Sequence, residues 1–182
     1  MDFTEKQLKR EEIFTGNVMH IVRDTVELPN GKSATREVAL HNGAVCIIPI
    51  TEDGKVVLER QYRYAVGKLL VEIPAGKLEV GEDPLECARR ELKEETGYDA
   101  DEMIDLGEYY GSPAILAEHI NMYLARGLKK GSTHFDEDEF LETFEMPLDQ
   151  LIDLVMAGNI PDAKTQLCAL KAREFLAREN VK

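Results

Sequence analysis

Basic residues are scarce in this 182-residue sequence, which has 22 Lys and Arg against 35 Asp and Glu and a formal charge of −13. Proteins that hold DNA, RNA or an anionic membrane by bulk electrostatics need a basic surface. We therefore expect neither nucleic acid nor membrane as a partner. The length suits one domain with a small extension, and the 43% hydrophobic content is typical of a globular protein.

Cysteines and long apolar segments are also few. The three cysteines, Cys46, Cys87 and Cys168, are far apart and have apolar neighbours, which favours reduced core thiols over disulfides or a zinc site. The longest apolar run, residues 43–50, is far shorter than the roughly 20 residues that span a bilayer. The first residues contain no apolar signal-peptide region. The sequence therefore predicts a cytoplasmic protein.

The negative charge is concentrated in two segments. Residues 72–108 contain 13 acidic and four basic residues, and residues 136–153 contain eight acidic residues and no basic ones. These segments carry −9 and −8, so the rest of the chain carries +4. A uniformly solvated acidic surface would not show this pattern. Divalent metal is the first candidate to explain it.

Strand and helix signals follow one another along the chain. Two β-rich segments flank a turn at 29–32 and predict an N-terminal hairpin. The expected strands are 18–28, 34–41, 43–50, 56–64, 69–73, 103–110, 119–125 and 141–146, and the expected helices are 83–96, 148–157 and 163–178. This order indicates an α+β or α/β sandwich. We expect an N-terminal strand region at residues 1–42 and the main domain at 43–182.

The helix expected at 83–96 gathers three carboxylates. Asp83 is a suitable N-cap, and Gly97 supplies the stop. Glu91, Glu94 and Glu95 follow the i, i+3, i+4 spacing, so they project from one arc that we expect to be exposed. They are either ordinary surface glutamates or a site where Mg²⁺ or Mn²⁺ removes the repulsion between like charges.

The residues around this helix complete a longer motif. Gly76 is followed by five residues, Glu82, seven residues and then the segment RELKEETGY at 90–98. This is the Nudix box, G-x5-E-x7-R-E-U-x-E-E-x-G-U, in which U is a bulky apolar residue. The chain therefore resembles the Nudix hydrolase family. That resemblance implies an α/β/α sandwich with a mixed sheet, and cleavage of a nucleoside diphosphate linked to another group.

The resemblance also implies roles for the residues of the box. Arg90 would hold the rotamers of the box carboxylates, and it is expected to take part in catalysis together with Glu94. Two or three Mg²⁺ ions are expected in each site, and Mn²⁺ is expected to substitute. The expected metal ligands are Glu91, Glu95, Glu94, Glu82 and the carbonyl of Ala75. Bound metal neutralises a pyrophosphate and lowers the pKa of a bound water.

Residues beyond the box point to a substrate class. Ser112 and Pro113 resemble the marker of ADP-ribose pyrophosphatases, although Ala114 replaces the usual glycine and an ordinary turn is the alternative. Nearly the whole chain is similar to bacterial ADP-ribose pyrophosphatases, which are homodimers. The resemblance implies hydrolysis of ADP-ribose to AMP and ribose 5-phosphate by a homodimer. The alternatives are another nucleoside diphosphate sugar, such as GDP-mannose, and a non-catalytic nucleotide sensor.

The remaining candidate residues follow from the same resemblance. Arg63 would contact the diphosphate, with a surface strand charge as the alternative. The other expected substrate contacts are Arg36, Glu37, Ser112, Pro113 and Glu118. The acidic run at 136–139, taken alone an ordinary solvated loop, aligns with a family loop that brings a catalytic glutamate over the metals. Glu137 is the expected general base and Glu139 a further metal ligand, and these two roles are interchangeable.

Overall fold

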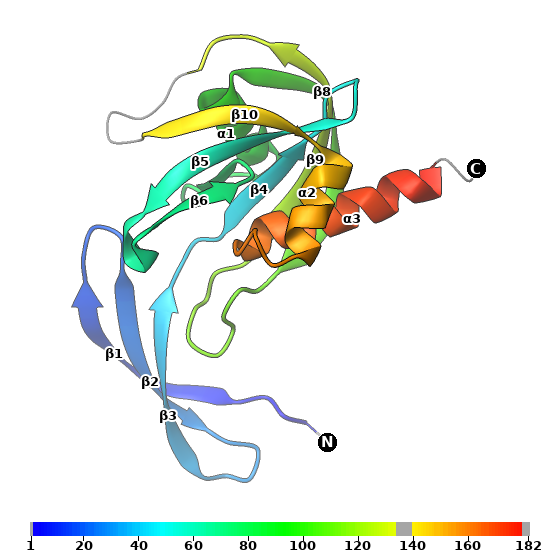
Figure 1. Cartoon of the computed structure of the whole chain (residues 1–182). Coiled ribbons are helices and arrows are strands. Elements are labelled where there is room, and N and C mark those ends of the chain that lie inside the picture. The colour runs from blue at the N-terminus through cyan, green and yellow to red at the C-terminus, as the bar shows by residue number, and fades with distance from the viewer. Residues whose placement is uncertain (1, 134–139, 180–182) are drawn as a thin grey trace. The chain divides into compact units, whose positions relative to one another are not determined.

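The computed structural model describes residues 2–133 and 140–179, and these form two compact units (Figure 1). The first unit comprises Met1–Gly43 and Tyr110–His119, and the second comprises Ala44–Tyr109 and Ile120–Lys182. Within the described residues, no helix has the length and apolar character needed to cross a membrane.

The first unit is an antiparallel sheet with the order β1-β2-β3. Its strands are β1 (Lys6–Thr15), β2 (His20–Glu27) and β3 (Ser33–Leu40). β2 and β3 are the predicted hairpin. β1 is missing from the sequence prediction because its segment, KQLKREEIFT, is rich in charge and buries none of its residues. This strand is ordered by backbone pairing with β2, because it has no buried apolar face.

The second unit contains two sheets and three helices. The four-stranded sheet has the order β7-β4-β9-β8 and the three-stranded sheet the order β10-β5-β6. β4 and β9 run parallel and the other pairs are antiparallel, so the first sheet is mixed, as predicted. The elements are β4 (Ala44–Pro49), β5 (Lys55–Arg63), η1 (Tyr64–Val66), β6 (Lys68–Glu72), β7 (Ala75–Lys77), α1 (Pro84–Thr96), β8 (Tyr98–Tyr109), β9 (Ile120–Lys130), β10 (Leu141–Pro147), α2 (Leu148–Met156) and α3 (Ala163–Glu179).

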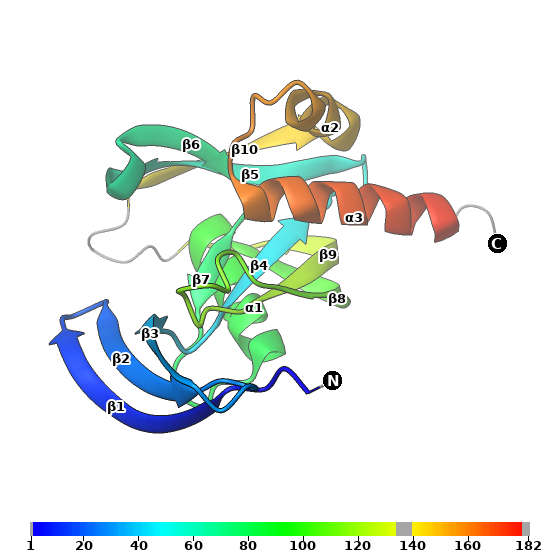
Figure 2. The same cartoon turned by 90° about the horizontal axis from the view of Figure 1, so that it is seen from below.

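Helices cover both faces of the four-stranded sheet in this unit. In Figure 2, α3 lies on one side of β4 and β9 and α1 lies on the other. Successive side chains of β4 alternate between the two layers, because strand residues point to opposite faces. Cys46 and Ile48 pack in the cluster with α2 and α3, whereas Val45 and Ile47 pack in the cluster with α1. The predicted sandwich is therefore confirmed.

Two strands extend further than the sequence prediction. β8 begins at Tyr98, directly after the helix stop, and β9 continues to Lys130. The addition to β9 is residues 126–130, and the addition to β8 includes the polar segment 99–102, which has low strand propensity by itself. These two added segments are ordered by pairing with each other, for example of Asp99 with Lys129. The short strand β7 has no counterpart among the expected strands, and it pairs with β4.

Candidate active site

Local signals determine where α1 begins and ends. The Asp83 carboxylate accepts hydrogen bonds from the N–H groups of Leu85 at 2.9 Å and Glu86 at 3.2 Å, as expected of an N-cap. Gly97 ends the helix with a φ of 74°. Ala88 and Leu92 are buried against the sheet. The register of the helix is therefore fixed, and with it the direction in which the box glutamates project.

Arg90 is the centre of a cluster of carboxylates on α1 and the preceding turn. Its Nε donates to Glu82 at 3.0 Å, and its Nη1 donates to Glu91 at 2.7 Å and to Glu94 at 3.1 Å. Glu82 also accepts from Arg90 Nη2 at 3.1 Å and from the N–H of Glu79 at 2.9 Å. These bonds, Arg90 first, lower the pKa of Glu82 to about 2. Three carboxylates thus share one guanidinium, and we refer to these four residues as the Arg90 cluster.

Two box carboxylates approach the backbone of β7. Glu95 is only 2% exposed and accepts a hydrogen bond from the N–H of Ala75 at 3.0 Å. The expectation that Glu95 projects from an exposed face is wrong, because this part of α1 packs against β7. A Cβ atom on Gly76 would overlap the carboxylate of Glu91. A side chain at position 76 would therefore displace the Glu91 carboxylate from the β7 backbone, which gives the glycine that begins the box a physical reason.

The donor set suits a hard divalent cation. Mg²⁺ and Mn²⁺ prefer carboxylate and carbonyl oxygens, which are the groups at Glu91, Glu94, Glu95 and Ala75. Within residues 2–133 and 140–179, no three such side chains already converge in the arrangement of a metal site. Arg90 instead gathers the carboxylates, so the chemistry of the donors, rather than a preformed cage, is what fits a metal here.

Arg63 lies at the end of β5 and pairs with Glu72, the last residue of β6. Its Nε donates to Oε1 at 2.9 Å and its Nη2 donates to Oε2 at 2.7 Å. The Glu72 carboxylate is buried and is also bonded by Lys164. Burial alone would raise the pKa of Glu72, but the two cations hold it below its ordinary value. Glu72 is therefore a charged group in the protein interior.

Sequence reasoning assigned no role to Glu72 or to Lys164. A signal for Glu72 was present, since it is the one acidic residue in the apolar run at 69–73. Glu59 follows Val56, Val57 and Leu58 in the same way and is fully buried. An acidic residue that continues a buried strand indicates a paired charge in the core.

Two predicted substrate residues lie on β3 in the first unit. The guanidinium of Arg36 pairs with the carboxylate of Glu5. Glu37 accepts a hydrogen bond from Arg23 Nη2 at 2.8 Å. Both side chains therefore have ion-pair partners within the first unit, so a substrate would have to compete for them.

The other predicted residues of the first unit lie in the segment 110–119. The carbonyl of Ser112 accepts two backbone hydrogen bonds and closes a turn that contains Pro113. Glu118 Oε1 is 3.6 Å from His41 Nε2. Glu137 and Glu139 lie outside the described residues, so their proposed roles stay predictions.

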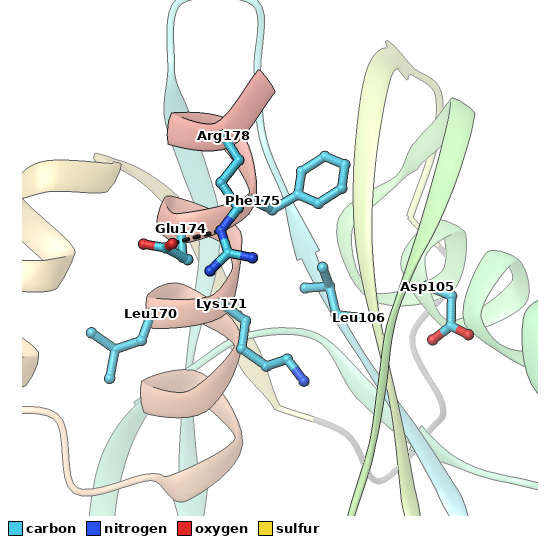
Figure 3. Close-up of a pocket in the computed structure, with 7 residues that line it drawn as sticks. All are labelled: Asp105, Leu106, Leu170, Lys171, Glu174, Phe175 and Arg178. Atoms are coloured by element: carbon cyan, nitrogen blue, oxygen red, sulfur yellow. Dashed lines mark hydrogen bonds and ion pairs between the residues drawn. The ribbon is translucent and has the colours of Figure 1, made fainter. Parts of the chain in front are cut away.

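A separate hollow of about 430 Å³ lies between α3 and β8 in the second unit (Figure 3). Its lining residues are apolar or form a balanced set of charges: Leu106, Leu170, Phe175, Asp105, Lys171, Glu174 and Arg178. Glu174 already accepts a hydrogen bond from Arg178 at 2.7 Å. Two cations and two anions cancel, and no predicted site residue takes part. The hollow is not suited to a diphosphate.

Two family models match consecutive parts of the chain. Residues 40–167 match the NUDIX domain, and residues 5–39 match the nucleoside diphosphate sugar hydrolase N-terminal domain. A methanol dehydrogenase activator of Bacillus methanolicus is 46% identical over 165 residues, which cover 90% of this chain and 89% of that protein. An ADP-ribose pyrophosphatase of Bacillus subtilis is 42% identical over 163 residues, 88% of each chain.

Two further matches, one by sequence and one by structure, also cover most of the chain. A GDP-mannose pyrophosphatase of Salmonella arizonae is 32% identical over 174 residues, 88% of this chain and 91% of that protein. A crystal structure of an ADP compounds hydrolase superposes with a TM-score of 0.87 at 26% identity, covering 98% of both chains. These matches confirm the predicted Nudix fold. With the complete box at residues 76–98 and the family match over most of its length, the chain belongs to the Nudix hydrolase family.

Proposed function

We propose that this protein hydrolyses the pyrophosphate bond of ADP-ribose to AMP and ribose 5-phosphate, using divalent metal. The observation that carries the proposal is the Arg90 cluster, in which the box carboxylates gather beside the β7 backbone. Nudix hydrolases generally use divalent metals, and these donors suit them. The identity with the ADP-ribose pyrophosphatase of Bacillus subtilis supports the choice of substrate.

The metal would be held by the oxygens of the box. The proposed ligands are Glu91, Glu94, Glu95, Glu82 and the carbonyl of Ala75, for two or three Mg²⁺ ions with Mn²⁺ as a substitute. Bound metal supplies neutralisation of the pyrophosphate and a water of lowered pKa. Arg90 orients three of these carboxylates and shields them from one another.

The general base is proposed to be Glu137, with Glu139 as a further metal ligand. Glu137→Gln should lower kcat by roughly 10²–10⁴-fold with little change in the affinity for metal. Should Glu139→Gln give that pattern and Glu137→Gln not, the two roles are exchanged. Arg63 is proposed to bind the diphosphate. Arg36, Glu37, Ser112, Pro113 and Glu118 are proposed to contact other parts of the substrate.

The N-terminal strand region, residues 1–42, is proposed to form a homodimer, while residues 43–182 carry the chemistry. β1 is an edge strand, all ten of its residues are exposed, and Leu8, Ile13 and Phe14 are apolar side chains among them. An exposed edge strand with apolar side chains is a site for pairing with another chain. Phe14→Lys should shift the protein from dimer to monomer in light scattering. Met156→Lys, a matched change at an exposed apolar residue of α2, should not.

A panel of substrates in ¹⁸O-labelled water tests the activity and names the attacked phosphorus. ADP-ribose should give AMP and ribose 5-phosphate, and the label should appear in one product. Faster turnover of GDP-mannose would replace the substrate and keep the chemistry. Absence of hydrolysis of every nucleoside diphosphate sugar in Mg²⁺ or Mn²⁺ would favour the nucleotide sensor. The three buried free cysteines support the proposed cytoplasmic location, where thiols stay reduced.

Activation of a methanol dehydrogenase is a second candidate function, because the Bacillus methanolicus relative bears that name and is 46% identical. Purified protein should then raise the rate of a methanol dehydrogenase supplied with its cofactor. Glu95→Gln separates two forms of this activity. Activation that is lost with Glu95→Gln depends on hydrolysis, whereas activation that persists depends on binding alone.

A further inference from the structure

Glu72 lies where two buried carboxylates face each other. In the β5–β6 ladder Glu59 is opposite Glu72, and the two residues are 0% and 1% exposed. Like charges directly opposite on neighbouring strands destabilise a sheet, and burial increases the cost. Cations are therefore needed at this point, and Arg63 and Lys164 supply them.

Lys164 reaches this position from the first turn of α3. Its ammonium donates to Glu72 Oε2, the oxygen that also accepts from Arg63 Nη2. It donates as well to Asp162 Oδ1 at 2.9 Å. Only 13% of the Lys164 side chain is exposed. A lysine is held in such a place only when carboxylates compensate its charge.

Further hydrogen bonds around this ion pair join the end of β6 to the start of α3. Asp162 Oδ2 accepts from the N–H of Thr165 at 2.9 Å and from its hydroxyl at 2.6 Å. The same hydroxyl accepts from the N–H of Ile73 at 2.9 Å. Ile73 follows Glu72 in the chain and Thr165 follows Lys164, so these bonds fix the position of the Lys164 ammonium relative to the Glu72 carboxylate.

We propose that Lys164 is a positioning residue for Arg63. Because Lys164 shares the carboxylate of Glu72, the guanidinium charge of Arg63 stays available for the substrate's diphosphate. Arg63 donates hydrogen bonds from Nε and Nη2 to Glu72, and its side chain is 39% exposed. Among the described residues, its Nη1 has no hydrogen-bond partner. The inference rests on the proposed function, in which Arg63 contacts the two phosphates.

Electrostatics gives Lys164 this effect. With Lys164 present, the negative charge of Glu72 is divided between two cations. Without it, that charge falls on Arg63 alone and weakens the attraction of Arg63 for phosphate. The loss of one of three bonds also frees the Glu72 carboxylate to rotate, and Arg63 would turn with it.

A first experiment needs no substrate. The Nε–H resonance of Arg63, identified in NMR spectra by its loss in Arg63→Lys, should shift in Lys164→Met and in Lys164→Gln. Lys171→Met is the matched control, because Lys171 is on the same helix and has no ion-pair partner among the described residues. It should leave the resonance in place. An unchanged Arg63 resonance in folded Lys164→Met or Lys164→Gln would overturn the inference, whatever the enzyme hydrolyses.

A second experiment measures binding of ADP-ribose by calorimetry without divalent metal. Lys164→Met should raise Kd about tenfold, the effect of one charge-assisted hydrogen bond, and Lys164→Arg should restore most of it. In protein that already carries Arg63→Met, adding Lys164→Met should raise the Kd for ADP-ribose less than about twofold, because Lys164 acts through Arg63. If Lys164→Met raised the Kd by the same factor in the wild-type protein and in Arg63→Met, the inference would be overturned. Failure of the wild-type protein to bind ADP-ribose would count against the proposed function, and the Arg63 resonance would still decide the inference.

Discussion

Two clusters of charge in the second unit are built in opposite ways. In the Arg90 cluster, three carboxylates share one guanidinium, and the side chains of Glu94 and Arg90 are partly exposed. At Glu72, a single carboxylate accepts three bonds from two cations and is buried. Both clusters contain Arg–Glu pairs, but carboxylates outnumber cations in the Arg90 cluster, whereas cations outnumber the carboxylate at Glu72.

That reversal separates two uses of a carboxylate. Three of the roughly four acceptor positions of the Glu72 carboxylate are occupied, so it holds protein groups in place and has little capacity left for a ligand. The carboxylates of the Arg90 cluster outnumber their cation, and their remaining lone pairs can accept a divalent metal. The first arrangement should therefore matter most for folding, and the second most for chemistry.

The largest expected effect is on stability, from Glu72→Gln. The change keeps the size of the side chain but leaves Arg63 and Lys164 without their shared charge. Breaking a buried pair costs about 3–5 kcal/mol, and we expect the lower end because Arg63 is partly exposed. Urea denaturation measures it. Glu82→Gln is the matched change in the Arg90 cluster and should cost about 1 kcal/mol or less. Equal costs would remove the distinction between the clusters.

Glu95→Gln should have the next largest effect, on catalysis. Gln can still accept the hydrogen bond from Ala75, so the free energy of unfolding should change little. Loss of the charge should lower kcat on the order of 10²–10³-fold, as for other groups that stabilise transition-state charge. Glu86→Gln, on the exposed side of the same helix, is the control. Near-normal rates for Glu95→Gln at saturating Mg²⁺ would show that Glu95 is not a metal ligand.

Much of the fold was predictable because its local signals agree with its packing. Asp83 and Gly97 fix α1, and the apolar run at 43–50 fixes β4. β1 was not predictable, because its order comes from pairing with β2 and not from a buried face. The polar start of β8 was hidden for the same reason. Patterns of burial cannot reveal a strand that is held by backbone pairing alone.

The site shows the same limit in its side chains. The motif identified Glu91, Glu94 and Glu95 as neighbours, since helical spacing alone brings them together. It could not show that Glu95 is buried, because that depends on β7, a strand that the sequence did not predict. The meeting of Glu72 with Lys164 joins residues 92 positions apart. No local pattern contains such a contact.

A smaller effect is expected from Arg90→Lys, which tests whether the Arg90 cluster depends on geometry or on charge. Lysine keeps the positive charge but cannot reach three carboxylates with a planar guanidinium. We expect activity to fall about 10–100-fold, the usual loss when a group that orients metal ligands is removed. The activity of Arg90→Met should fall at least as far. Full activity in Arg90→Lys would show that charge alone suffices, and the orienting role of Arg90 would be wrong.

The smallest effect concerns the pH dependence of stability. Arg90 and the N–H of Glu79 lower the pKa of Glu82 from its ordinary value of 4.5 to about 2. A carboxyl group with a depressed pKa in the folded state stabilises the protein above the ordinary value, and this contribution is lost as the pH falls from 4.5 towards 2. The difference in unfolding free energy between the wild-type protein and Glu82→Gln should therefore shrink across that window. A difference that stays constant would mean that Glu82 acts through the contacts of its side chain, with no contribution from its charge.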